Sequence, residues 1–173
     1  FLITYLPVLR QSGPRGWLEV INFLPITWDY LNVTKTNLLW GWIATHLRVR
    51  SAWPFPVSFG IPYLLLLVFF VTSADLLLSA MKRRALGQAD RFHDSAMLCV
   101  AIAVVTCWVC MLRIGDHSVW SLVYRLVPGA GAIRVVFRFQ VVLELAVIAV
   151  AAYGLSLAWR GSRAQNTITT RPL

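Results

Sequence analysis

Charged side chains are scarce in this sequence of 173 residues, since Asp, Glu, Lys and Arg together make up only 13% of it. Soluble domains carry roughly 25% charged residues. Hydrophobic residues reach 58%, and the mean hydropathy is +0.68. A disordered chain has the opposite composition, and a soluble domain of this size has too little interior for so much apolar surface. The composition therefore predicts a polytopic membrane protein.

Acidic residues are also few, 7 against 16 Lys and Arg, which leaves a formal net charge of +9. In a soluble domain such an excess would suggest nucleic-acid binding. Here the positive residues lie between apolar runs, where membrane topology and anionic lipid account for them. We therefore expect membrane lipids as partners, and no nucleic acid.

The sequence lacks the motifs of common catalytic sites, with no Gly-rich phosphate loop, no G-x-S-x-G and no H-E-x-x-H. Cys107 and Cys110 have the C-x-x-C spacing of zinc and redox sites. The pair lies inside an apolar run without a second pair of ligands, so packing is the simpler interpretation. Asp116-His117 has no third ligand nearby. No cofactor and no metal site are assigned, and a role for a divalent metal stays open.

Three apolar runs are long enough to cross the ~30 Å hydrocarbon layer as helices. We expect spans over 56–80, 95–112 and 139–159. The apolar residues 1–9 are too few to span and are expected to be the end of a fourth helix. This suggests that the chain is the C-terminal part of a longer protein. The expected fold is all-α, with polytopic transmembrane helices.

The segments between the apolar runs differ in charge. Segment 81–94 is short and basic, and the polar tail 160–173 adds further arginines. By the positive-inside rule both are expected in the cytoplasm. Segments 10–55 and 113–138 then form loops on the outer side. The predicted location is the bacterial plasma (inner) membrane, crossed several times.

The second outer loop contains a predicted interfacial helix. Val119, Leu122, Val123 and Leu126 follow the i, i+3, i+4, i+7 pattern of one apolar helix face. Such a helix is expected to lie along the membrane surface. Pro128-Gly129 ends it.

The first outer loop is rich in tryptophan, which favours the headgroup zone of a bilayer and also stacks against sugars. Asp29 lies in it between Trp28 and Tyr30. A carboxylate flanked by aromatic residues is typical of sugar-contacting surfaces, whereas an ordinary loop aspartate is simply solvated. We keep Asp29, Tyr30 and Trp40 as candidates for a sugar or acceptor cleft.

Arg134 and Arg138 are four residues apart, just before the third apolar run. On a helix they would share one face. Two guanidinium groups at a helix start suit a phosphate, because donors, dipole and charge all favour an anion. The sequence therefore predicts a lipid-phosphate site at Arg134 and Arg138. The alternative is that both arginines only extend toward the headgroups of ordinary lipids.

Polar residues inside the apolar runs are a further group of candidates. Glu144 lies within the third run, and Gln140 is four residues earlier on the same helical face. An intramembrane carboxylate is a functional candidate by default, and a structural interhelical hydrogen bond is the alternative. With Asp75 in the first run, Glu144 also permits an ion or proton relay. A transporter or flippase segment, or a non-catalytic integral membrane protein, is thus the alternative function.

Several short motifs resemble bacterial multi-pass membrane proteins related to glycosyltransferases of the GT-C fold. The segment 124–129, Tyr-Arg-Leu-Val-Pro-Gly, precedes Arg134-Val135-Val136-Phe137-Arg138. The family pattern is similar: Tyr-x-x-x-Pro-Gly, then Arg-Val-Pro-x-Arg-Phe at the start of a late span. Val136 stands where proline is usual. Segments 28–31 (Trp-Asp-Tyr-Leu) and 39–41 (Leu-Trp-Gly) resemble the outer-loop pattern of the same proteins.

The resemblance implies a transferase that moves a sugar from a polyprenyl-phosphate donor to an acceptor outside the cytoplasm. It implies that Arg134 and Arg138 hold the donor phosphate. In that fold the key acidic residues lie in the first outer loop near the N-terminus of the whole protein. No catalytic residue is therefore assigned in this chain.

Overall fold

The computed structural model describes residues 7, 13, 16–47, 60–89, 91–127, 130, 133 and 136–169 (in the last range, without the side chains of 137, 161 and 163–169). The expected helix end at 1–9 lies outside these residues apart from Pro7. Two compact units make up the chain, and each is described by itself. Unit 1 comprises Phe1–Pro62 and Val105–Val142, and unit 2 comprises Tyr63–Val104 and Leu143–Leu173.

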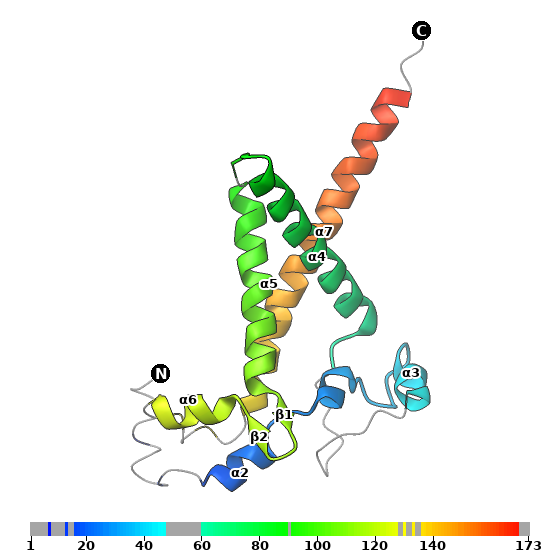
Figure 1. Ribbon diagram of the computed structural model, residues 1–173. Coiled ribbons are helices and arrows are strands. Elements are labelled where there is room, and N and C mark those ends of the chain that lie inside the picture. The colour runs from blue at the N-terminus through cyan, green and yellow to red at the C-terminus, as the bar shows by residue number, and fades with distance from the viewer. Residues whose placement is uncertain are drawn as a thin grey trace. The chain divides into compact units, whose positions relative to one another are not determined.

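Helices dominate the described residues (Figure 1). The long helices are α4 (Tyr63–Ala85), α5 (Phe92–Met111) and α7 (Gln140–Thr169). The short elements are the helices α2 (Trp17–Asn22), α3 (Gly41–His46) and α6 (Trp120–Leu126), the 3-10 helices η1 (Thr27–Leu31) and η3 (Val136–Phe139), and the strands β1 (Arg113–Ile114) and β2 (His117–Ser118). The two strands pair antiparallel around Gly115-Asp116. The all-α class with three long apolar helices is confirmed.

Among the described residues, three helices are long and apolar enough to cross a membrane: Tyr63–Ala85, Phe92–Met111 and Gln140–Arg160, with mean hydropathies of 2.2, 2.0 and 2.2. At 1.5 Å per residue these lengths match the ~30 Å hydrocarbon layer. Only 17–28% of each apolar window is buried inside the protein. Most of this apolar surface therefore needs lipid to cover it.

The helix ends differ from the predicted span ends because charge marks the membrane boundary rather than the end of a helix. α4 begins after Pro62 and continues through Lys82 and Arg84 to Ala85. Lys and Arg are good helix formers and suit a helix C-terminus. α5 begins at Phe92 and includes Asp94 in its first turn, where a carboxylate is favoured by the helix dipole.

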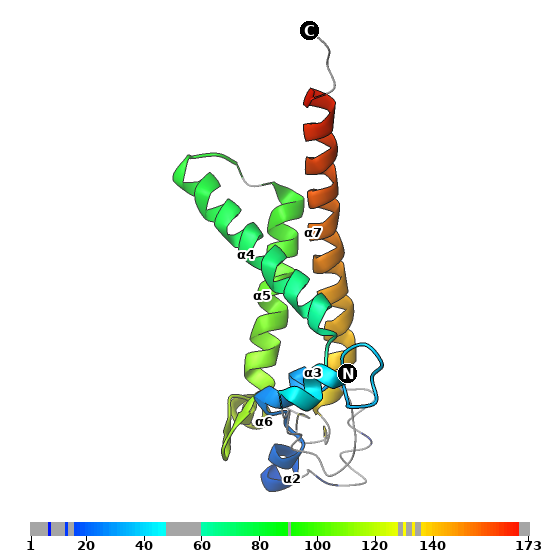
Figure 2. The same ribbon diagram turned by 90° about the vertical axis from the view of Figure 1, so that its right-hand side faces the viewer.

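Unit 1 joins segments that are far apart in the sequence. α2, α6 and the hairpin gather around the C-terminal end of α5 (Figures 1 and 2). Arg113 connects them, since its backbone N–H donates to the Pro25 carbonyl at 2.8 Å and its guanidinium donates to the Ile21 carbonyl at 3.1 Å. The rings of Trp17 and Tyr124 lie 5.4 Å apart. The two loops predicted on one side of the membrane thus contact each other.

The short helix α6 leaves its apolar side uncovered by the described residues. Val119, Leu122 and Leu126 of the predicted face are 46%, 57% and 76% exposed. A helix of this kind is stabilised when its apolar side enters the interfacial layer of a bilayer. The helix itself is present, and its position at the membrane surface stays a prediction.

Unit 2 packs α4 closely against α7. Phe69, Thr72, Leu76 and Ala80 recur every three or four residues and form the buried stripe of α4. Thr72 faces Gly154 of α7 so closely that a Cβ at position 154 would overlap the threonine side chain. Small residues allow this close backbone approach, which drives helix association where lipid surrounds the protein.

Candidate functional site

Asp29, the first of the cleft candidates, is buried in unit 1, and its carboxylate stabilises the turn in which it lies. Its side chain is in η1, and the residue is only 3% exposed. One carboxylate oxygen accepts a hydrogen bond of 2.8 Å from the backbone N–H of Ile26. This caps the start of the 3-10 helix, as an acidic side chain does at a helix N-terminus. The carboxylate is thus directed at the backbone rather than presented on a surface.

Tyr30 is anchored to the end of α5 that belongs to unit 1. Its hydroxyl donates to the Trp108 carbonyl at 3.1 Å, and the two rings lie 5.8 Å apart. Burial raises the pKa of Tyr30 above its usual value of 10, and the negative charge of Asp29 acts in the same direction. Tyr30 is therefore a neutral hydrogen-bond donor across the physiological pH range.

Trp40 precedes α3 and is half-buried. Its backbone N–H donates to the Asn37 side-chain oxygen at 3.0 Å. This hydrogen bond fixes the turn that leads into α3. The structure therefore gives both Asp29 and Trp40 a role in shaping the loop 16–47.

Gln140 is fully buried at the start of α7. Its side-chain oxygen accepts a hydrogen bond of 2.9 Å from the indole N–H of Trp108. Because indole only donates, this contact fixes the amide orientation and leaves the Gln140 Nε2 facing away from Trp108. That nitrogen is buried without a hydrogen-bond partner among the described residues. Glu144, one turn later, is half-buried.

The two residues of the predicted lipid-phosphate site are not both described. Arg134 lies outside the described residues, so its distance from Arg138 is not assigned. Arg138 lies in η3 and is exposed, directly before α7 begins. Its side chain therefore stands where an apolar span starts.

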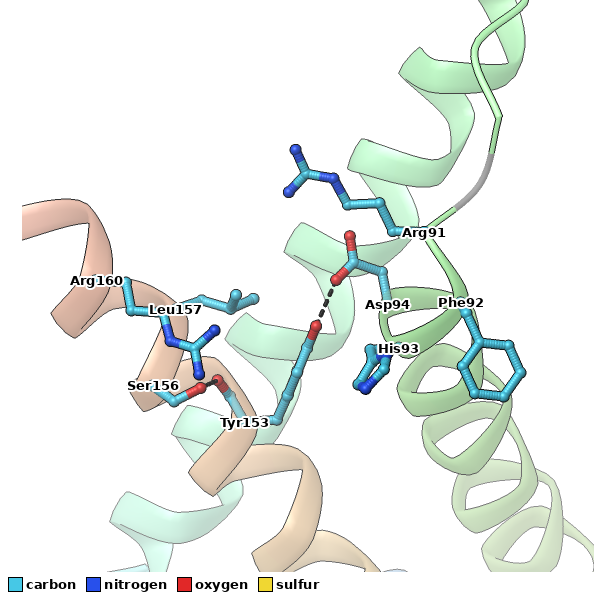
Figure 3. Close-up of a pocket in the computed structure, with 8 residues that line it drawn as sticks. All are labelled: Arg91, Phe92, His93, Asp94, Tyr153, Ser156, Leu157 and Arg160. Atoms are coloured by element: carbon cyan, nitrogen blue, oxygen red, sulfur yellow. Dashed lines mark hydrogen bonds between the residues drawn. The ribbon is translucent and has the colours of Figure 1, made fainter. Parts of the chain in front are cut away.

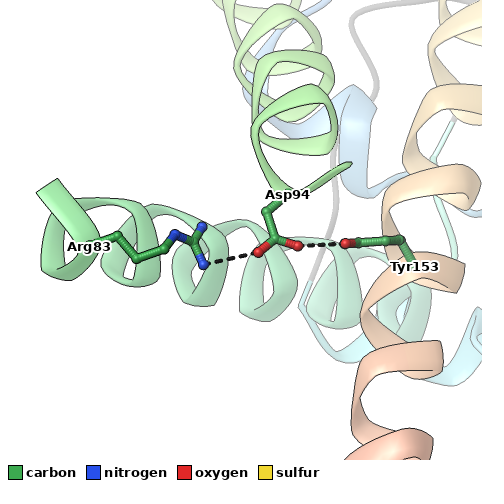
Figure 4. Close-up of polar contacts among 3 residues, drawn as sticks. All are labelled: Arg83, Asp94 and Tyr153. Carbon is green, nitrogen blue, oxygen red and sulfur yellow. Dashed lines mark hydrogen bonds and ion pairs between the residues drawn. The ribbon is translucent and has the colours of Figure 1, made fainter. Parts of the chain in front are cut away.

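A cluster that the sequence did not predict lies in unit 2 around Asp94. Arg83 of α4 pairs with one oxygen of Asp94 at 3.0 Å. The hydroxyl of Tyr153, on α7, donates to the other oxygen at 2.5 Å (Figure 4). The side chains of Arg83 and Asp94 are only 15% and 11% exposed. One carboxylate thus links all three long helices of unit 2.

A cavity of about 560 Å³ adjoins this cluster (Figure 3). Its lining comes from the start of α5 and from α7: Arg91, Phe92, His93, Asp94, Tyr153, Ser156, Leu157 and Arg160. The volume is within the usual range of small-molecule sites. Arg91 and Arg160 supply two positive charges, whereas the one carboxylate is already paired with Arg83. The cavity therefore suits an anion.

The sequence held only a weak signal for this cavity. Arg91 and Asp94 belong to the basic segment 81–94, whose charge predicts the orientation of the chain in the membrane and not a cavity. Tyr153 lies within the apolar run 139–159, and nothing in its sequence neighbourhood indicates a polar partner. Its pairing with Asp94 joins residues 59 positions apart, and helical periodicity does not reveal such a contact.

Metal ligands do not gather in the part of the chain that the structure describes, where no three His, Cys, Asp or Glu residues lie close enough to hold an ion. The three cysteines are free thiols.

A comparison with protein-family models, curated proteins and solved structures finds no match to this chain.

Proposed function

We propose that this chain is the membrane portion of a GT-C-like glycosyltransferase that uses a polyprenyl-phosphate-linked sugar donor on the outer face of the bacterial plasma membrane. Three apolar helices of spanning length support the membrane part of this proposal. The motifs at 28–31, 39–41 and 124–138 support the transferase part, through their resemblance to that family.

The observation that carries the proposal is the exposed position of Arg138 at the start of α7. A polyprenyl phosphate places its charged group where its apolar chain enters the bilayer. Arg138 lies at the matching point of the protein, directly before an apolar span. In the same unit, α6 leaves apolar side chains exposed, which suits a surface at the level of the lipid headgroups.

The chemistry required of Arg134 and Arg138 is electrostatic. When the bond between the sugar's anomeric carbon and the phosphate oxygen breaks, the bonding electrons leave with the lipid phosphate. Guanidinium groups bound to that phosphate stabilise the developing negative charge. The acceptor hydroxyl attacks the anomeric carbon and loses a proton to a base that is not assigned in this chain.

The proposal is tested by replacing both arginines in the intact protein, as Arg134→Gln/Arg138→Gln. We expect transfer from a polyprenyl-phosphate-linked hexose to fall by about 10²-fold or more, the usual effect of losing one stabilising donor in a transition state. Lys35→Gln/Arg125→Gln is the matched control, because it removes two exposed charges from unit 1. Unchanged donor binding and transfer in the Arg134/Arg138 variant would remove this site assignment.

A further inference from the structure

We propose that the cavity lined by Arg91 and Arg160 binds the phosphate-bearing headgroup of an anionic membrane lipid. This site, called here the Arg91–Arg160 cavity, is separate from the Arg134/Arg138 site. Arg138 comes two residues before the helical span Gln140–Arg160, whereas Arg160 is its last residue. The two proposals therefore stand or fall independently.

The first argument is charge. The side chains of Arg91 and Arg160 make no hydrogen bond or ion pair with any described residue, and both line the cavity beside the Tyr153 side chain. In Figure 3 their side chains come from the two helices that border the cavity. Asp94 does not cancel them, since its carboxylate is held by Arg83 and Tyr153. Two uncompensated guanidinium groups at one cavity favour a phosphate.

The second argument is position along the helices. Arg91 immediately precedes the apolar window Phe92–Met111, and Arg160 ends the window Gln140–Arg160. Both side chains therefore lie where a span meets the headgroup layer. Basic pockets between transmembrane helices at this level bind anionic lipid headgroups.

The third argument is the mixed lining of the cavity. Phe92 is 80% exposed, and Leu157 lines the cavity from α7. These apolar side chains suit the upper part of an acyl chain, while His93 and Ser156 add polar groups. A free phosphate ion would bind the arginines but would make no favourable contact with Phe92 and Leu157. The combination therefore favours a lipid over a soluble anion.

The cluster around Asp94 explains how the cavity keeps its shape. Arg83, Asp94 and Tyr153 connect α4, α5 and α7 through one ion pair and one hydrogen bond (Figure 4). A buried and paired carboxylate of this kind costs free energy when either partner is removed. In our proposal Asp94 and Tyr153 are positioning residues, and Arg91 and Arg160 contact the ligand.

Native mass spectrometry of the purified full chain tests the proposal. The protein is released from mixed micelles that contain equal amounts of phosphatidylglycerol and phosphatidylcholine. We expect phosphatidylglycerol to be retained in preference. In Arg91→Gln/Arg160→Gln its affinity should fall by about thirtyfold, since each cation near a bilayer surface contributes about fivefold. Both arginines are exposed, so folding should be preserved, as circular dichroism would verify.

The matched control is Lys82→Gln/Arg84→Gln, which removes two charges from the neighbouring end of α4 but none from the cavity lining. It should retain the preference for phosphatidylglycerol. An equal loss in the control, or no preference in the wild-type protein, would overturn the proposal. Displacement of the lipid by millimolar inorganic phosphate would overturn the assignment to a lipid and leave a site for free phosphate.

Discussion

At the scale of single residues, the role of a described polar side chain depends on its hydrogen-bond partner. Asp29 is an acidic group beside aromatic residues, yet its carboxylate binds the backbone N–H of Ile26 at 2.8 Å. Trp108 is one of many aromatic residues in the apolar runs, yet it connects Tyr30 and Gln140 through its carbonyl and its indole N–H. In a water-poor interior, a lost partner costs more than the hydrogen bond itself contributes.

This argument predicts the effect of Trp108→Phe. The substitution keeps an aromatic ring beside Tyr30 but removes the donor to Gln140, whose amide is fully buried. We expect a loss of about 1–3 kcal/mol in stability, measured as a lower Tm by circular dichroism in detergent. Trp159→Phe is the control, because Trp159 is 63% exposed. The same Tm in both variants would contradict the structural role of the indole N–H.

At the scale of helices, apolar character and packing specificity come from different residues. Most of the surface of α4 and α7 is apolar and not buried by protein, so hydrophobicity alone leaves many ways to pair them. At Thr72 and Gly154 the two helices lie so close that no side chain fits at position 154. Small residues of this type determine which faces of two membrane helices meet.

Gly154→Leu is predicted to disrupt this contact. A side chain at position 154 overlaps Thr72, so α4 and α7 must move apart or shift. We expect a destabilisation of about 1–3 kcal/mol, typical of overpacking, seen as a lower Tm of the detergent-solubilised protein. Ala152→Leu is the matched control on the same helix, because Ala152 is exposed. If both leucine variants unfold alike, the contact does not specify the pairing.

At the scale of the whole molecule, the three apolar helices separate the connecting segments into two sets. α5 lies between the turn at Leu86-Gly87 and the hairpin at 113–118. If α5 crosses the bilayer once, these two segments lie on opposite sides. The basic residues Lys82, Arg83, Arg84 and Arg91 favour the cytoplasm for the first of them.

Single-cysteine labelling tests this arrangement after Cys99, Cys107 and Cys110 are replaced by alanine. Gln88→Cys and Asp116→Cys both place a thiol at an exposed position. A membrane-impermeant maleimide should label Gln88→Cys in inverted vesicles and Asp116→Cys in right-side-out vesicles. Labelling of both from one side would exclude a span at α5.

The sequence by itself determined the all-α class and the approximate place of the three long helices, because each is an unbroken apolar run that depends only on local composition. It also predicted the apolar face of α6, which is a local helical pattern. It missed the Asp94 cluster and the Trp108–Gln140 hydrogen bond, which join residues 59 and 32 positions apart. Only the tertiary structure decided these contacts, because they depend on how helices pack and not on the character of any one segment.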